Sequence, residues 1–290
     1  MRDLVRQGLA AAQSRPYGFW ETMAARLVDA QAPGLARLVR EMSAIPATGE
    51  GWQERLLERL GRLFLLLEGF KRLESLPPDT QADIRTAIGW SHNQDELLAA
   101  PGVRDAWLVA GQHVTEEERL RTQRTWLWGR ASGRPALVLH FAHAGQPLDT
   151  SLLPGACIEA DLVFYPSATP LRALVKERYG VPTAFDSLPA SPSVAAAVAS
   201  YATALAGNPW LERYPLAVDG VVPVRQGASW LICDAARHAL PIHPRFQHTW
   251  ELAAVSGGSP VTLFGEWDGD VLQPLSVQAA DQFVFWGGLS

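Results

Sequence analysis

The chain has 290 residues, of which 48% are hydrophobic, and its 25 Lys and Arg against 30 Asp and Glu give a formal net charge of −5. This length and composition can fill a substantial core in one large domain or two ordinary ones. The small negative charge excludes a general attraction to phosphate backbones or anionic lipids, and it disfavours nucleic-acid binding through charge alone.

Residues 1–100 predict a series of amphipathic helices cut by prolines and glycines. The first is expected over 4–12 and the second over 17–30. The third, over 33–42, has a proline at the first turn, where its missing N–H costs nothing.

The fourth helix has the strongest pattern and is expected from Trp52 to Leu73. Its apolar side is wide enough to pack against two neighbours and consists of Leu56, Leu57, Leu60, Leu63, Phe64, Leu67 and Phe70. A further helix is expected after Pro78 to about Ile88, where Gly89 ends it. Such helices with short connections predict a bundle or a short helical array.

Beyond Gly102 the segments shorten, and β-branched and aromatic residues predict strands in mainly antiparallel sheets. Strands at 103–109 and 120–128 flank the charged stretch Thr115 to Glu118, which is predicted to be an exposed loop. Two more strands are expected at 136–142 and 156–164.

A short helix is predicted at 171–179, and residues 182–192, rich in Pro, Ser and Ala, form the best internal linker candidate. A helix over 194–206 follows. Near the end, strands at 261–267 and 270–275 flank Asp268-Gly269, a dipeptide that favours a type I′ turn. The expected fold is therefore α+β, with a helical domain over 1–100 and a β-rich domain over 101–290.

Histidine spacing raises the question of a metal site at His140, His143, His238, His243 and His248. The last three recur every five residues, which suits neither a helical face nor a strand face, and prolines at 241 and 244 break any regular element. No thiolate or carboxylate pattern accompanies them. The sequence predicts no metal site.

Carboxylate pairs occur at Glu159 with Asp161 and at Glu266 with Asp268. A pair at a suitable separation can perform acid and base catalysis on glycosides, but exposed strand charges have the same pattern. The chain has no G-x-S-x-G, phosphate-loop or H-E-x-x-H motif. No catalytic or cofactor-binding residue is predicted, and a hydrolase using one of these pairs remains an alternative.

Cys157 and Cys233 are each isolated, as expected of buried thiols in a reducing compartment. The amino terminus lacks the apolar core of a signal peptide, and the longest apolar run, 63–67, is far shorter than the ~20 residues of a membrane span. We therefore expect a cytoplasmic protein that does not enter membranes. Most of the 11 tryptophans lie in apolar runs and are predicted to be core, with one or two left for an interface.

Several stretches together carry a family resemblance: residues 2–9, 16–20, 30–36, 121–128 and 256–269. They resemble the region downstream of the zinc finger in bacterial SWIM zinc-finger proteins. The finger itself has the pattern C-x-C followed by C-x-H, which neither Cys157 nor Cys233 fits. The resemblance therefore implies the carboxy-terminal part of such a protein without its finger, and it carries over no zinc ligand.

In that family the finger binds DNA or proteins, and the genes often lie beside those for a MoxR-type AAA+ ATPase and a von Willebrand A-type protein. The resemblance thus implies a non-enzymatic scaffold or adaptor with protein partners and no cofactor. The alternatives are a hydrolase and a nucleic-acid-binding module. A cleft holding Glu159 and Asp161 would favour the hydrolase, an apolar patch the adaptor, and an Arg-rich groove the nucleic-acid module.

Overall fold

The computed structural model describes residues 8–117, 120–143, 145–185, 187–280 and 282–287. The chain divides into a helical unit, which comprises residues up to Asn93 with the short segments 166–168 and 208–210, and a β-rich unit, which comprises the rest. The helices precede the sheets, and every paired strand in the described residues is antiparallel to its neighbour apart from isolated bridges. The α+β prediction is confirmed.

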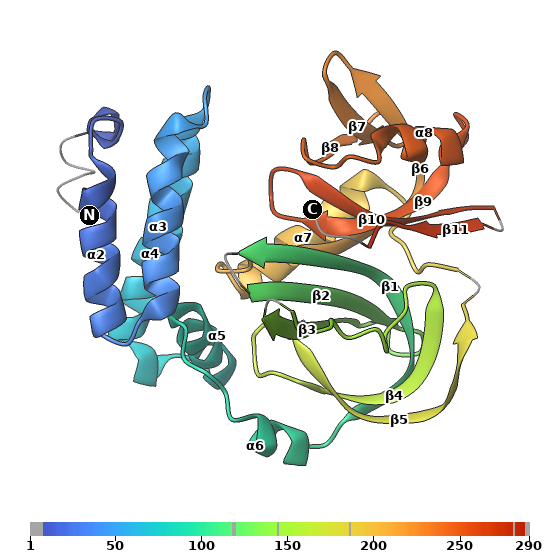
Figure 1. Ribbon diagram of the computed structural model, residues 1–290, viewed down its shortest axis with the longest axis horizontal. Helices are drawn as coiled ribbons and strands as arrows, with labels where there is room; N and C mark the ends of the chain where they lie inside the picture. Colours follow the sequence, from blue (N-terminus) through green and yellow to red (C-terminus); the bar gives the residue numbers. More distant parts are fainter. Residues whose placement is uncertain (1–7, 118–119, 144, 186, 281, 288–290) are drawn as a thin grey trace. The chain divides into compact units, whose positions relative to one another are not determined.

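The helical unit contains the later predicted helices (Figure 1). Of the first, predicted over 4–12, residues 4–7 lie outside the described residues, and Leu9–Ala12 form a 3-10 turn. Its α-helices are α2 (Tyr17–Asp29), α3 (Pro33–Ala44), α4 (Trp52–Lys71) and α5 (Pro78–Ile88), and its 3-10 turns are η1 (Leu9–Ala12), η2 (Ile45–Ala47) and η3 (Leu73–Ser75). Large side chains that meet in its core include Trp20, Val39, Met42, Leu56, Leu66 and Ile84.

The apolar side of α4 is only partly covered. Leu56, Leu60 and Leu63 are buried as predicted, because they face the core of the bundle. The prediction was wrong for the other four members of that side, since Leu57, Phe64, Leu67 and Phe70 are 54%, 52%, 37% and 42% exposed. Leu57 and Phe64 each follow a buried leucine by one residue, which turns them ~100° around the helix and away from that core.

Glycines let α3 approach α5 closely. Gly89 ends α5 with φ 101°, and the backbone N–H groups of Gly89 and Trp90 donate to the Arg85 carbonyl. A Cβ on Gly34, in the first turn of α3, would lie 2.7 Å from the Ile88 carbonyl carbon and closer still to the Ala87 oxygen. Any side chain at position 34 would force these two helices apart.

We therefore expect Gly34→Ala to lower the free energy of unfolding by about 1–3 kcal/mol, as overpacking does. Gly61, in the middle of α4, has nothing within 4 Å of its potential Cβ. Gly61→Ala is the matched control and should stabilise by up to about 1 kcal/mol, because alanine is the better helix former. Urea unfolding followed by circular dichroism compares them, and equal effects would contradict the close approach of α3 to α5.

The β-rich unit begins with α6 (Gln94–Ala99) and a first sheet of order β3-β2-β1-β4-β5. The strands are β1 (Val103–Glu117), β2 (Leu120–Gly129), β3 (Pro135–His143), β4 (Ala156–Phe164) and β5 (Ala173–Ala184). The loop predicted at Thr115 to Glu118 is wrong for its described part, because Thr115–Glu117 extend β1, and Glu116 pairs opposite Arg121. Such opposite charges across an exposed ladder stabilise strands.

The helix predicted at 171–179 is also wrong, because most of that range lies in β5. Ala173 and Val175 face the core beneath β4, while several side chains further along this edge strand are exposed. β5 also takes up the first residues of the predicted linker, Pro182 to Ala184.

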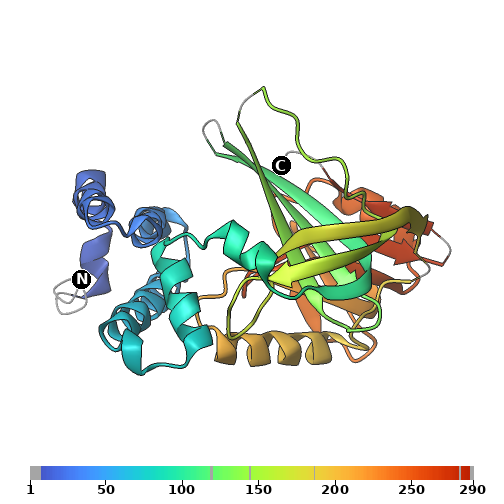
Figure 2. The same ribbon diagram turned by 90° about the horizontal axis from the view of Figure 1, so that it is seen from below.

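The first sheet curls into a small barrel (Figure 2). A parallel bridge joins Leu137, on β3, to Arg172, just before β5, and the Leu137 N–H donates to the Leu171 carbonyl at 2.7 Å. The interior is filled by residues such as Trp107, Val109, Leu127, Ile158 and Leu162.

The second sheet has the order β11-β10-β9-β6-β7-β8 and packs with α7 (Val194–Gly207), which confirms the helix predicted there. Its other elements are β6 (Tyr214–Gln226), β7 (Ser229–Cys233), β8 (Ala239–Pro241), α8 (Thr249–Ser256), β9 (Val261–Trp267), β10 (Leu272–Ala279) and β11 (Gln282–Phe285).

Strands β6 to β10 repeat the connectivity of β1 to β5, and β11 adds a sixth strand beside β10. In each set of five, the long first strand pairs with the second and fourth strands. An isolated parallel bridge joins the region of the third strand to that of the fifth, at Leu137 with Arg172 and at Ile242 with Leu272. Each first strand has a register shift, ending at Gly111 in β1 and spanning Gly220 in β6. This resembles the connectivity of the OB-type Greek-key barrel. The β-rich unit is thus an internal repeat of two small barrels in its described residues.

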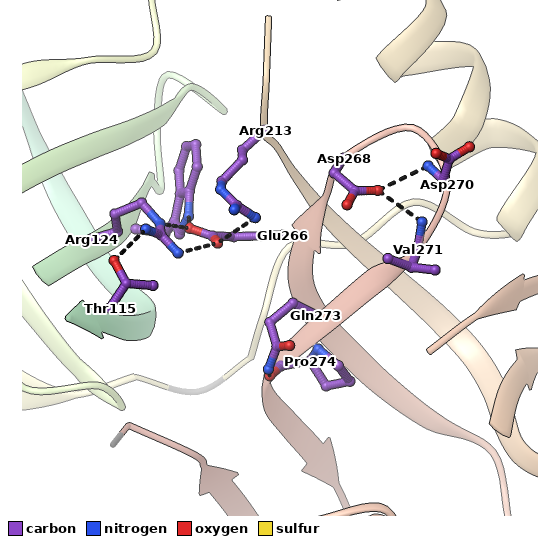
Figure 3. Close-up of polar contacts among 10 residues, drawn as sticks. Thr115, Arg124, Arg213, Glu266, Asp268, Asp270, Val271, Gln273 and Pro274 are labelled. Atoms are coloured by element: carbon purple, nitrogen blue, oxygen red, sulfur yellow. Dashed lines mark hydrogen bonds and ion pairs between the residues drawn. The ribbon is translucent and has the colours of Figure 1, made fainter. Parts of the chain in front are cut away.

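The hairpin of β9 and β10 is confirmed in position but not in turn type. Trp267 pairs with Leu272, so Asp268–Val271 form the loop. Gly269 has φ 105° as predicted, but Asp268 does not share a positive φ, which excludes type I′. Instead, Asp268 Oδ1 accepts the backbone N–H groups of Asp270 and Val271 at 2.9 and 2.8 Å (Figure 3).

Candidate functional site

The most concentrated polar chemistry of the β-rich unit is a buried cluster between its barrels, around Glu266 of β9. Glu266 is 1% exposed and Arg124 of β2 is 9% exposed. Arg124 Nε and Nη2 donate to the two carboxylate oxygens at 2.8 and 3.0 Å, a bidentate pair (Figure 3). Trp126 Nε1 donates to the same carboxylate at 2.9 Å.

Strand alternation explains this placement. Leu127 points into the first barrel, so its neighbour Trp126 points outward and packs with Phe264 of β9 between the barrels. Arg124 and Glu266 lie two residues along β2 and β9 from this contact and share the same faces. The adjoining layer around Trp126 and Phe264 is apolar, and the Glu266 side chain is fully buried.

Further polar groups surround the pair. Arg213 Nη1 lies 3.6 Å from Glu266 Oε2, and Thr115 Oγ1 accepts from Arg124 Nη1 at 3.3 Å. His113, opposite Arg124 in the β1–β2 ladder, is 7% exposed.

Burial alone would raise the pKa of Glu266, but the guanidinium groups of Arg124 and Arg213 and the Trp126 N–H outweigh it and hold this pKa below its ordinary value. Burial lowers the pKa of His113 to about 4. At neutral pH the cluster therefore holds a fixed carboxylate and a neutral imidazole. A general acid or base needs a pKa near the working pH, so these groups are suited to holding the barrels together.

The structure separates the predicted pair of Glu266 and Asp268, because Glu266 is buried against Arg124 and Asp268 caps an exposed turn. Sequence reasoning missed Arg124 and Trp126, although both lie in the stretch 121–128 that carries the family resemblance.

The other predicted pair lies on β4, where Glu159 is exposed and Asp161 is half-buried. The Tyr179 hydroxyl is 3.0 Å from Asp161 Oδ2 and 2.8 Å from Glu177 Oε2, and the Arg104 guanidinium lies 4.0 Å above the Tyr179 ring. The hydrogen bond with Glu177, burial and the bond with Asp161 raise the pKa of Tyr179 to about 12. Asp161 thus belongs to a cross-strand network with β5.

The histidines are dispersed over separate local contacts. His238 lies 3.5 Å from Asp234, His248 lies 3.0 Å from Glu251, and His140 Nδ1 accepts the Asp149 N–H at 3.3 Å. In the described ranges no group of three or more His, Cys, Asp or Glu side chains could hold a metal ion. Cys157 is buried, Cys233 is half-buried, and neither forms a disulfide.

Most tryptophans are buried or half-buried, as predicted, and Trp20, Trp107 and Trp126 are among the largest fully buried side chains. The exceptions in the described residues are Trp90, 43% exposed, and Trp250, 65% exposed. Trp250 packs edge-on against Trp230. Trp90 lies in the helical unit, near the exposed Phe70 of α4.

Comparison with known families identifies the helical unit. Residues 1–88 match the model of the SWIM-associated four-helix bundle domain, and α2 to α5 lie within that range. This confirms the resemblance to SWIM proteins for the amino-terminal part of the chain. The match ends before residues 121–128 and 256–269, for which the resemblance stays a prediction.

Neither the curated proteins nor the solved structures gave a match. In the described residues, no helix combines the length and apolarity needed to cross a membrane.

The buried pair gives a direct test through Arg124→Met, Glu266→Gln and the double variant. Each single change leaves the other member of the buried pair without its partner, so each should lower the free energy of unfolding by about 3 kcal/mol or more. The double variant should lower it by clearly less than the sum of the two. As a control, Arg37→Gln removes an ion pair whose side chains are about half exposed, at 48% and 50%, and should cost under about 1 kcal/mol. Additive single effects in urea unfolding would show that the two residues do not stabilise each other.

The cluster also predicts a pH dependence. His113 binds a proton below about pH 6.5 when unfolded but only below about pH 4 in the folded chain, so the unfolded state binds more protons between these values. Stability should therefore fall as the pH drops through this window, by up to about 3 kcal/mol from His113. Burial lowers the pKa of His243 too, which adds a loss of the same sign.

Urea unfolding at pH 7 and pH 5 measures this loss of stability. Both pH values lie above the lowered pKa of Glu266, so its carboxylate stays ionised in the folded chain. His113→Asn should flatten the pH dependence more than the matched variant His243→Gln. The assignment to His113 would be wrong if His113→Asn kept the full slope of the unchanged protein.

Proposed function

We propose that the chain is a non-enzymatic scaffold or adaptor that acts by binding other proteins. The observation that carries this proposal is the exposure of four large apolar side chains along α4, Leu57, Phe64, Leu67 and Phe70. Their exposed fractions lie between 37% and 54%, although their chemistry is that of core residues. Apolar surface of this kind on a soluble domain is typical of a protein-binding face, and amphipathic helices are a common way to present one.

The family match supports the partner class. Because residues 1–88 match a SWIM-associated domain, the proposed partners are a MoxR-type AAA+ ATPase and a von Willebrand A-type protein. The chain would act in their assembly, in the cytoplasm, without a cofactor of its own.

The hydrolase alternative receives less support from the described carboxylates. Glu266 is held as an anion by Arg124, and Asp161 is engaged by Tyr179. Glu266 and Asp268 do not form a glycosidase pair, because Glu266 is buried against Arg124 and Asp268 accepts N–H groups of its own turn.

Nucleic-acid binding is the second candidate, because OB-type barrels bind oligonucleotides on the face of their second and third strands. In the first barrel, however, the outer side of β2 at Arg124 and Trp126 is covered by β9. On the second barrel, Leu231 of the second strand β7 pairs with Val224 of the first strand β6, so the outer side there is apolar, not basic. These observations and the net charge of −5 place the adaptor first.

The proposal is tested by measuring binding of the full chain to the purified MoxR-type ATPase and von Willebrand A-type protein of the same organism. We expect at least one to bind with a Kd of about 10 µM or tighter. Phe64→Glu should weaken that binding about tenfold or more, because a charge would be placed in the apolar contact.

The matched control is Val28→Glu, which changes a side chain of α2 that is also about half exposed, at 45%. It should leave the affinity within about twofold, with circular dichroism showing both variants folded. Absence of binding to either protein, or equal effects of both variants, would reject the proposed role.

A further inference from the structure

The helical unit carries a shallow hollow of about 600 Å³ at the C-terminal end of α4. The residues lining it include Phe70, Arg72, Leu73, Glu74, Arg85 and Trp90. We call it the aromatic-basic hollow. Phe70 lines this hollow and is also one of the four exposed apolar side chains of α4.

The aromatic wall of the hollow is held in a fixed arrangement. The Phe70 and Trp90 rings meet edge to face, with centroids 5.9 Å apart and planes at 85°. Trp90 Nε1 donates to the Gln31 carbonyl at 3.0 Å, which fixes the indole, yet Phe70 and Trp90 remain 42% and 43% exposed. An apolar side chain could therefore bind there without ordering the wall first.

The charge of the hollow is positive although the whole chain is negative. Lys71 is paired with Glu68 at 2.6 Å. Arg85 Nη2 donates to the neutral amide oxygen of Gln81 at 3.1 Å. Within the described part of the chain, neither Arg85 nor Arg72 has a carboxylate in an ion pair, so two guanidinium groups remain available beside the aromatic wall, with Glu74 as the single lining carboxylate.

We propose that the aromatic-basic hollow binds a short segment of a partner protein in which an apolar side chain is flanked by carboxylates. The apolar side chain contacts Phe70 and Trp90. The carboxylates bind Arg72 and Arg85, whose planar guanidinium groups suit bidentate contact. This inference rests on the proposed function, because the segment comes from the partner that the adaptor binds.

A nucleic acid would offer a stacking base and a phosphate to the same groups. Its affinity, however, depends on a series of cations along the backbone, and this hollow offers only two without a carboxylate in the described residues. Its size also matches a few side chains better than a strand of nucleotides. The acidic, apolar peptide is therefore the favoured ligand.

The test is fluorescence anisotropy with the full chain and a labelled peptide in which Leu and Phe are flanked by Glu. One control peptide replaces every Glu with Gln, a second replaces Leu and Phe with Ser, and a labelled oligothymidylate is the nucleic-acid probe. We expect the acidic, apolar peptide to bind at least about tenfold more tightly than the other three probes.

The variants locate the site. Arg72→Gln combined with Arg85→Gln, and separately Trp90→Ala, should each weaken peptide binding about tenfold or more. The matched controls, Arg26→Gln and Tyr17→Ala, change exposed side chains of α2 and should have no effect. Since Trp90→Ala also removes the bond to Gln31, the arginine variant decides if Trp90→Ala fails to fold.

Equal affinity for the Gln peptide, tighter binding of the oligothymidylate, or an arginine variant with unchanged affinity would overturn the inference. If the ATPase or the von Willebrand A-type protein binds the chain while the arginine variant has no effect, the inference fails and the proposed function stands. If the peptide binds as expected but neither protein does, the assembly role fails and the ligand chemistry of the hollow stands.

Discussion

The β-rich unit is organised around one buried charge. A carboxylate removed from water costs several kcal/mol unless it is paired and hydrogen-bonded, and Glu266 finds its partners, Arg124 and Trp126, more than a hundred residues earlier in the chain. This requirement fixes how β9 faces β2. If the register of either strand shifted by one residue, Glu266 or Arg124 would point into a barrel interior and the ion pair would be lost. Glycine at 111 is part of the same constraint, because a Cβ there would lie 2.7 Å from that of Leu275 in the opposing barrel.

The success of sequence-based prediction depends on the range of the forces involved. Helices α2 to α5 were predictable because periodicity, prolines and the left-handed Gly89 act locally. The exposure of Leu57 and Phe64 could not be predicted, because the width of an apolar stripe does not show how much of it neighbouring helices cover. The segment 171–179 was predicted as a helix, although Ala173 and Val175 face the core as alternate residues of a strand do. Its strand conformation depends on its pairing with β4, which the residues of the segment do not reveal by themselves. Glu266 and Glu159 looked alike for the same reason, since one is buried and the other exposed by elements distant in the sequence.

The repeated connectivity of the barrels could not be predicted from the sequence, because it is set by non-local strand pairing. The two copies also differ in strand length and in the segment after the third strand. In the second copy α8 lies between β8 and β9, whereas in the first the chain from β3 to β4 places Leu152 in the barrel core without a helix among its described residues. A shared connectivity therefore required no shared pattern of residues.

The same comparison bears on function, because a fold leaves open how its surfaces are used. On the first barrel, the outer side of β2 at Arg124 and Trp126 is covered by β9, while on the second the outer side of β6 and β7 carries Val224, 40% exposed, and its partner Leu231. The barrels thus engage their strongest polar groups with one another, buried in the Glu266 cluster and on the surface in the Tyr179 network. The helical unit has the opposite distribution, with exposed apolar side chains at one end of α4 beside guanidinium groups that have no carboxylate in an ion pair among the described residues. If the chain acts through contact with a partner, this asymmetry favours the helical unit as the part that makes the contact.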